Sequence, residues 1–218
     1  MKRLLILLIV AVFTAQIPSA VPADVPASIA VIDSGTNSSL FKDQIATEVC
    51  VISSYKCPNG KLFMEGAGAA NLPATSDKNF NHGTQMISVI TRVNPAAKII
   101  PIRIVGMTPA GNMALYTLED VKAALDWVVT NQAKYNISVV SLSQGKIFAN
   151  CKVPAGMAEQ VAKLKALNVP VIASVGNDGN RTSVMSPSCL PDTVSVGATD
   201  NPHPGVQGIA YDVKAVPY

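Results

Sequence analysis

Short aliphatic runs alternate with longer amphipathic segments along most of this chain. Turn-forming residues bound the aliphatic runs, which cover residues 28–33, 98–105, 137–142, 169–175 and 193–197. Between them, apolar positions recur at the three-to-four spacing typical of helices in residues 82–93, 117–128 and 154–167. Strands of this length that alternate with helices predict an α/β fold with a mostly parallel sheet and right-handed crossovers.

The segment between residues 36 and 80 follows neither pattern. Residues 48–52 could form a strand, but small residues occupy positions 66–70, so we expect mostly loops in this segment. Cys50 and Cys57 flank a short stretch of it, and a bond between them would leave the remaining cysteines, Cys151 and Cys189, as the second pair. Four cysteines allow three pairings, of which we favour this one.

The first 23 residues predict a secretory signal peptide. Lys2 and Arg3 precede an apolar run at residues 4–13, and small residues suited to cleavage follow at 19–23. The run is too short to span a bilayer comfortably, although an uncleaved membrane anchor is the alternative. Cleavage would leave residues 24–218 as one domain, free of the membrane and secreted or periplasmic, where disulfides form.

Charge and composition exclude several classes of ligand. The net charge of +3 falls to +1 without Lys2 and Arg3, which gives no basic patch for nucleic acid. Two histidines and no Cys-x-x-Cys spacing argue against a zinc cluster. Carboxylates such as Asp43 and Asp77 lack the spacing of a calcium-binding loop, so we expect no cofactor, and calcium is unsupported.

Three predicted strands end on polar or small residues, and parallel sheets form their sites at that edge. These ends are residues 33–35, 143–145 and 176–179. His82 opens the first predicted helix, where it could face Asp33; a carboxylate beside an imidazole fixes its tautomer and stabilises the imidazolium. Gly83 leaves room for a close approach of another chain segment. Taken singly, His82 is more often a surface residue, and Asp33 could simply cap a turn.

The other two strand ends suggest complementary roles. Asn177 lies on a glycine-flanked turn and offers an amide donor of the kind that stabilises an oxyanion. The main chain of Ser143, Gln144 and Gly145 presents an edge on which an extended peptide could pair. A nucleotide-binding sheet is disfavoured, because one glycine follows the first strand where that fingerprint needs three.

Four motifs occur in a specific order, which is more telling than any of them alone. They are Val31-Ile32-Asp33-Ser34-Gly35, His82-Gly83-Thr84, Ser143-Gln144-Gly145 and Gly176-Asn177-Asp178-Gly179. Together with the strand at residues 193–197, they resemble the motifs of the subtilisin-like serine peptidases, or subtilases, over residues 29–200. The resemblance implies a three-layer sandwich with helices on both faces of the sheet, and a monomer that hydrolyses protein or peptide substrates.

The same resemblance implies a role for each site residue. Asp33 would be the triad carboxylate, His82 the general base and Asn177 the oxyanion-hole donor. Ser143 to Gly145 would form the strand that binds the substrate backbone.

Three features depart from the family pattern. The family's nucleophile lies in a Gly-Thr-Ser-x-Ala sequence, and this chain contains no Gly-Thr-Ser. We therefore expect a partial catalytic domain that lacks the serine segment, with a natural pseudoenzyme that captures extended peptides as the alternative. The stretch before Asp33 is too short for the usual prodomain. Gln85 stands where many relatives carry a second histidine.

Overall fold

The computed structural model describes residues 25–74, 78–114, 116–148, 150–179 and 182–198. The predicted signal peptide and residues 199–218 lie outside the described residues. Within the described ranges, no helix is both long and apolar enough to cross a membrane.

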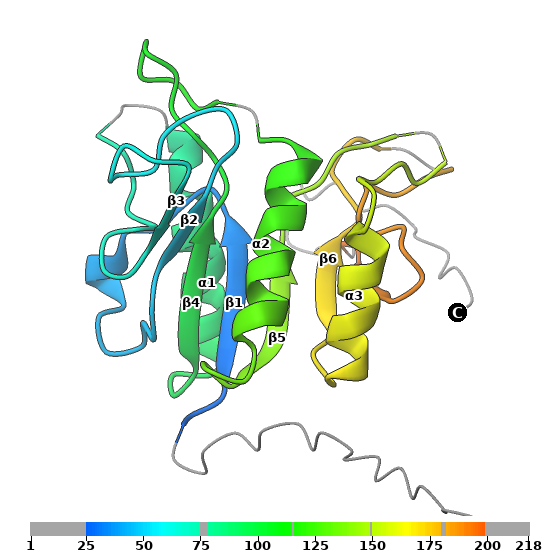
Figure 1. The fold of residues 1–218 in the computed structure, drawn as a ribbon, viewed down its shortest axis with the longest axis horizontal. Helices are drawn as coiled ribbons and strands as arrows, with labels where there is room; N and C mark the ends of the chain where they lie inside the picture. Colours follow the sequence, from blue (N-terminus) through cyan, green and yellow to red (C-terminus); the bar gives the residue numbers. More distant parts are fainter. Residues whose placement is uncertain (1–24, 75–77, 115, 149, 180–181, 199–218) are drawn as a thin grey trace, which may run out of the picture.

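A twisted, mostly parallel sheet forms the centre of the described structure (Figure 1). Its strands are β1 (Ser28–Asp33), β2 (Val49–Val51), β3 (Phe63–Glu65), β4 (Lys98–Arg103), β5 (Ile137–Leu142), β6 (Val171–Ser174) and β7 (Thr193–Val196). They lie in the order β3-β2-β4-β1-β5-β6-β7, and every neighbouring pair is parallel except β2 with β3. The predicted α/β class with a mostly parallel sheet is confirmed.

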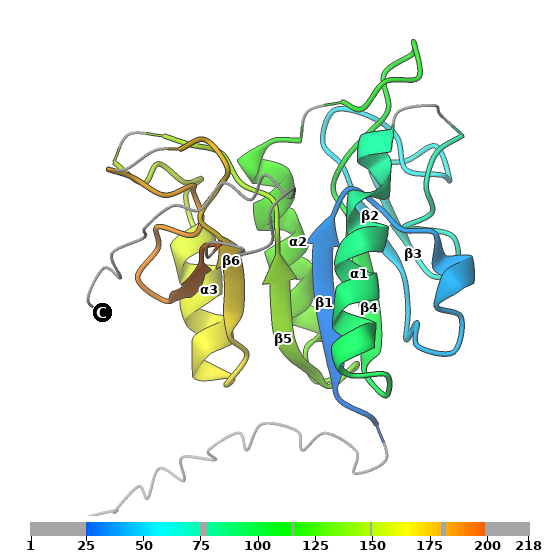
Figure 2. The ribbon, with the colours of Figure 1, turned by 180° about the vertical axis from the view of Figure 1, so that it is seen from behind.

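Helices cover both faces of this sheet, as the subtilase resemblance implies. Helix α1 (His82–Val93) packs on one face, while α2 (Leu118–Asn131) and α3 (Met157–Ala166) pack on the other (Figures 1 and 2). Successive side chains of a strand point to opposite faces. Accordingly, Ile32 of β1 belongs to the core under α2 and α3, whereas Val31 joins Ile87 of α1 in the core on the opposite face.

The helix starts follow local sequence signals. In the capping box before α2, the Asp120 N–H donates to Thr117 Oγ at 3.2 Å, and the Thr117 N–H donates to an Asp120 carboxylate oxygen at 2.7 Å. Helix α3 begins three residues later than the predicted Pro154, because Gly156 adopts a left-handed conformation with φ of 80° that a right-handed helix cannot include.

The loop prediction for residues 36–80 was partly wrong. Strand β2 confirms the expected strand near residues 48–52, but β3 and two short 3₁₀ helices, Ser38–Leu40 and Lys78–Asn81, were missed. A three-residue strand is too short to carry a periodic pattern. Tertiary contacts stabilise β3, since Glu65 accepts hydrogen bonds from the Tyr135 hydroxyl at 2.6 Å and the Trp127 indole at 3.1 Å.

Both predicted disulfides are confirmed. Cys50 in β2 bonds to Cys57, and Cys151 bonds to Cys189, which joins the segment before α3 to the turn before β7. The first closes 7 residues and the second 38. The second therefore ties together two segments that follow different strands of the sheet.

Removing the longer cross-link should destabilise the protein more than removing the shorter one. On the chain-entropy account, the Cys151→Ser/Cys189→Ser variant should lose about 4 kcal/mol of unfolding free energy. The matched Cys50→Ser/Cys57→Ser variant should lose about 2 kcal/mol, because its loop is shorter. Urea denaturation of both variants and the wild type measures the difference. Equal losses would contradict the entropic explanation.

Candidate active site

Asp33 and His82 meet at the carboxyl edge of the sheet, 49 residues apart in the sequence. Asp33 is the last residue of β1, and His82 is the first residue of α1. The His82 Nδ1 atom lies 2.8 Å and 2.9 Å from the two carboxylate oxygens of Asp33. Asp33 is buried, with 2% of its surface exposed, whereas the His82 side chain is 40% exposed. The structure thus joins a shielded carboxylate to an imidazole that solvent can reach.

The turn after β1 holds the first turn of α1 in place. The Ser34 hydroxyl donates to the Phe80 carbonyl at 2.9 Å and accepts from the Gly83 N–H at 3.2 Å. The Ser34 N–H donates to Asp33 Oδ1 at 2.6 Å and so orients the carboxylate. The close approach predicted at Gly83 is to the backbone of Gly35, since a Cβ atom at Gly83 would lie 2.2 Å from the Gly35 carbonyl oxygen.

The Asp33 carboxylate sets the protonation chemistry of His82. Its hydrogen bond raises the pKa of His82, and burial of the ring partly opposes that shift. Because Nδ1–H donates to the carboxylate, Nε2 is the ring nitrogen left to accept a proton. This is the arrangement in which a histidine works as a general base with a fixed tautomer.

Gln144 contributes a side chain to this pair, whereas only its main chain was predicted to take part in the site. The side-chain amide of Gln144 donates to Asp33 Oδ1 at 3.1 Å and lies 3.4 Å from His82 Nδ1. The parallel register of β1 and β5 pairs Ile32 with Leu142, and its continuation places Ser143 opposite Asp33. Gln144 comes next, after β5 has ended, so the strand pattern alone does not predict that its side chain reaches Asp33.

The main chain of Gly145 is already hydrogen bonded in this structure. The Tyr116 hydroxyl donates to the Gly145 carbonyl at 2.6 Å, and the Gly145 N–H donates to the same hydroxyl at 2.8 Å. Lys146 pairs with Ser186, N–H to carbonyl in both directions, at 3.0 Å and 2.8 Å. No sequence signal pointed to Tyr116. The role of Ser143 to Gly145 in substrate binding stays a prediction.

Asn177 lies in a bend three residues after β6 and is exposed. Because β1, β5 and β6 run parallel, this bend is at the same edge of the sheet as Asp33. The preceding Gly176 has φ of 105°, which only glycine adopts readily, and its N–H donates to the Ser174 hydroxyl at 3.2 Å. The oxyanion role of Asn177 stays a prediction.

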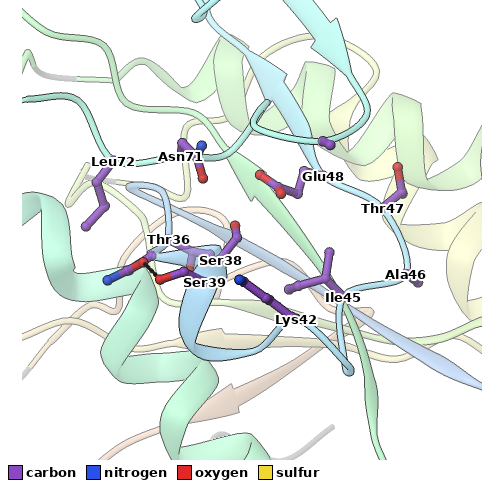
Figure 3. A pocket seen from close by; sticks show the side chains of 12 residues that line it. Thr36, Ser38, Ser39, Lys42, Ile45, Ala46, Thr47, Glu48, Asn71 and Leu72 are labelled. Atoms are coloured by element: carbon purple, nitrogen blue, oxygen red, sulfur yellow. Dashed lines mark hydrogen bonds between the residues drawn. The ribbon is translucent and has the colours of Figure 1, made fainter.

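A cavity of about 720 Å³ lies beside the turn that follows β1 (Figure 3). Residues of the ranges 36–48 and 67–72 line it, with Lys42 as its cation and Glu48 as its carboxylate. Glu48 accepts a hydrogen bond from the Ala70 N–H at 3.1 Å. The described residues do not contain a group of three or more His, Cys, Asp or Glu placed to hold a metal ion.

Comparisons with known proteins agree with this geometry. The chain is 28% identical over 141 residues to "Subtilisin-like protease 3" of Pseudogymnoascus destructans, an alignment that covers 61% of this chain and 32% of that protein. It is 26% identical over 164 residues to "Minor extracellular protease Epr" of Bacillus subtilis, which covers 70% of this chain and 23% of that protein. The chain therefore spans about a third or less of these relatives.

Solved structures share the fold at low sequence identity. Sphericase superposes with a TM-score of 0.57 at 17% identity, over 82% of this chain and 55% of that one. A protease from Pseudoalteromonas arctica gives a TM-score of 0.61 at 17% identity, over 79% of this chain and 56% of that one. The model of the subtilase family matches residues 26–216, which is most of the sequence. This chain belongs to the subtilase family of serine peptidases.

Proposed function

We propose that this chain provides the carboxylate and the general base of a secreted serine endopeptidase of the subtilisin type. The observation that carries the proposal is the hydrogen bond of 2.8 Å between His82 Nδ1 and the buried Asp33 carboxylate. It fixes the imidazole with Nε2 free to accept a proton, as acyl transfer to a serine requires. The match to the subtilase family supports peptides as the substrate class.

In the proposed reaction, a serine Oγ bonds to the substrate carbonyl carbon while its proton passes to His82 Nε2. The negative charge that develops on the carbonyl oxygen would be stabilised by the Asn177 side-chain amide. The C–N bond then breaks, and His82 returns the proton to the leaving amine. Water repeats the sequence on the acyl-enzyme, which releases the second product and the serine.

The proposed reaction needs a serine nucleophile in addition to Asp33 and His82. The two Gly-Thr pairs of the chain precede Asn37 and Gln85, so the 218 residues contain no Gly-Thr-Ser. We expect the isolated chain to be inactive by the triad route, because binding and the oxyanion hole alone leave only residual catalysis. A peptide-binding protein without catalysis is the alternative function, and a reading frame that stops after Tyr218 would favour it.

Secretion is part of the same proposal. Two disulfides among the described residues suit an oxidising compartment, and one relative is named an extracellular protease. The predicted signal peptide at residues 1–23 would direct export, and N-terminal sequencing of the exported protein would locate its cleavage site.

An activity assay on the product of the complete reading frame tests the proposed function. We expect cleavage of a denatured protein substrate, and we expect a serine-directed phosphonate to abolish it. The His82→Ala variant should lose activity to a similar extent, because triad members act as a unit. Peptidase activity that survives both the phosphonate and this substitution would contradict the proposal.

A further inference from the structure

The Tyr116 hydroxyl occupies both polar groups of the Gly145 main chain. It donates to the Gly145 carbonyl at 2.6 Å and accepts from the Gly145 N–H at 2.8 Å. In an antiparallel sheet, a hydrogen-bonded residue pair exchanges the same two bonds, one N–H to carbonyl in each direction. One hydroxyl therefore makes the contacts that one residue of an extended peptide would make with Gly145.

The surroundings of Tyr116 keep this contact in place. Burial raises the pKa of Tyr116, so the hydroxyl retains its proton and remains a donor at neutral pH. The Lys146 ammonium lies 5.7 Å from the centre of the Tyr116 ring, within reach of a cation–π contact. On its other side, Gly145 packs against Ser186, since a Cβ atom at Gly145 would lie 2.7 Å from the Ser186 carbonyl oxygen.

Gly145 thus has little freedom to move away from the tyrosine. The next residue, Lys146, exchanges main-chain hydrogen bonds with Ser186 in both directions, which holds the segment after Gly145 in place. A peptide that pairs with Gly145 must therefore displace the Tyr116 hydroxyl and replace both of its hydrogen bonds. Any group that replaces only one of them leaves a partly buried polar group unpaired, which is costly.

We propose that Tyr116 is a specificity-determining residue that admits an extended peptide only where the peptide can replace its hydroxyl on Gly145. The inference rests on the proposed role of the Ser143 to Gly145 edge in substrate binding. It specifies the substrate further, because the peptide residue opposite Gly145 must carry both an N–H and a carbonyl. Proline or another N-alkylated residue at that position cannot donate to the Gly145 carbonyl, so the site disfavours it.

The test compares the wild-type chain with the Tyr116→Phe variant, which keeps the ring and removes the hydroxyl. The probes are acetyl-tetra-alanine amide and analogues of it that are N-methylated at one alanine each, with affinities measured by titration calorimetry. Without the competing hydroxyl, the variant should bind the unmethylated peptide about tenfold more tightly, given the modest net strength of two hydrogen bonds. The analogue that is N-methylated at the alanine opposite Gly145 should not bind the variant more tightly than it binds the wild type.

The matched control is Tyr135→Phe, which removes a hydroxyl that donates to Glu65 at 2.6 Å rather than to Gly145. Its peptide affinity should equal that of the wild type. Hydrogen exchange of the Gly145 amide gives a second readout that needs no peptide. We expect this amide to exchange faster in Tyr116→Phe than in the wild type or in the control.

Each outcome separates the inference from the proposed function. Equal or weaker peptide binding by Tyr116→Phe would overturn the inference and leave the peptide-binding edge intact. Unchanged exchange of the Gly145 amide would overturn it too, because the hydroxyl would not hold that amide in solution. Failure of every variant to bind the unmethylated peptide would instead overturn the proposed substrate edge, and the inference with it.

Discussion

Replacing Asp33 with asparagine is expected to lower the pKa of His82 and, in a form of the protein that hydrolyses peptides, to reduce kcat about ten-thousandfold. The hydrogen bond that His82 donates to Asp33 is the largest cause of the raised pKa of His82, and burial, which lowers that pKa, would then act alone. An asparagine amide can also donate to Nδ1 and so favour the wrong tautomer. An NMR titration of the His82 ring measures the pKa directly.

The same substitution should change how stability depends on pH. The pKa of His82 is raised in the folded protein, so its protonation stabilises the fold below the unfolded-state pKa. This contribution is lost as pH rises through the folded-state pKa. Asp33→Asn should therefore lose more unfolding free energy, relative to wild type, at mildly acidic than at alkaline pH. In an active form, activity falls below the pKa of His82, because the general base must be neutral to accept a proton. A raised pKa therefore shifts that fall in activity to a higher pH.

A control for charge is the Asp43→Asn variant, which removes a carboxylate from an exposed position. Surface substitutions of this kind usually change stability by less than about 0.5 kcal/mol. The pKa of His82 should be the same in this variant as in the wild type. If the titration of His82 were also the same in Asp33→Asn, the carboxylate would not be the partner that the structure shows.

Much of the fold follows from local patterns in the sequence. The aliphatic run before Asp33 predicts β1, and the apolar spacing after His82 predicts α1, because burial on one face of each element leaves a periodic signal. Their meeting point could also be predicted. Parallel strands share a carboxyl edge, so a carboxylate after one strand and a histidine at a nearby helix start converge there.

The details of the site depend on contacts that leave no periodic signal. Gln144 lies two residues beyond β5, where strand alternation no longer sets the side-chain direction, yet its amide donates to Asp33 Oδ1 at 3.1 Å. Tyr116 lies just before α2, and its partner Gly145 is 29 residues away, beyond β5. Long-range pairings of this kind depend on how whole elements pack, so a single sequence does not reveal them.

Replacing Gly83 with alanine is expected to destabilise the protein by about 3 kcal/mol, the upper range of the cost of overpacking. The added Cβ would lie 2.2 Å from the Gly35 carbonyl oxygen and 3.1 Å from Asp33 Cβ. The turn cannot retreat easily, because the Asp33 carbonyl accepts a hydrogen bond from Ile104 at 3.0 Å. Helix α1 cannot retreat either, because Ile87 is fully buried against the sheet. Urea denaturation measures the loss.

The sign of this result distinguishes packing from helix propensity. Alanine is better than glycine inside a helix by about 1 kcal/mol, so propensity alone predicts a more stable variant. Gly60→Ala is the matched control: its Cβ would meet nothing within 4 Å, and its φ of 78° should cost only about 1–2 kcal/mol. If Gly83→Ala were as stable as the wild type, α1 would not rest on the turn after β1. Because that contact brings His82 to Asp33, we also expect the variant to weaken their hydrogen bond, which a lower pKa of His82 would reveal.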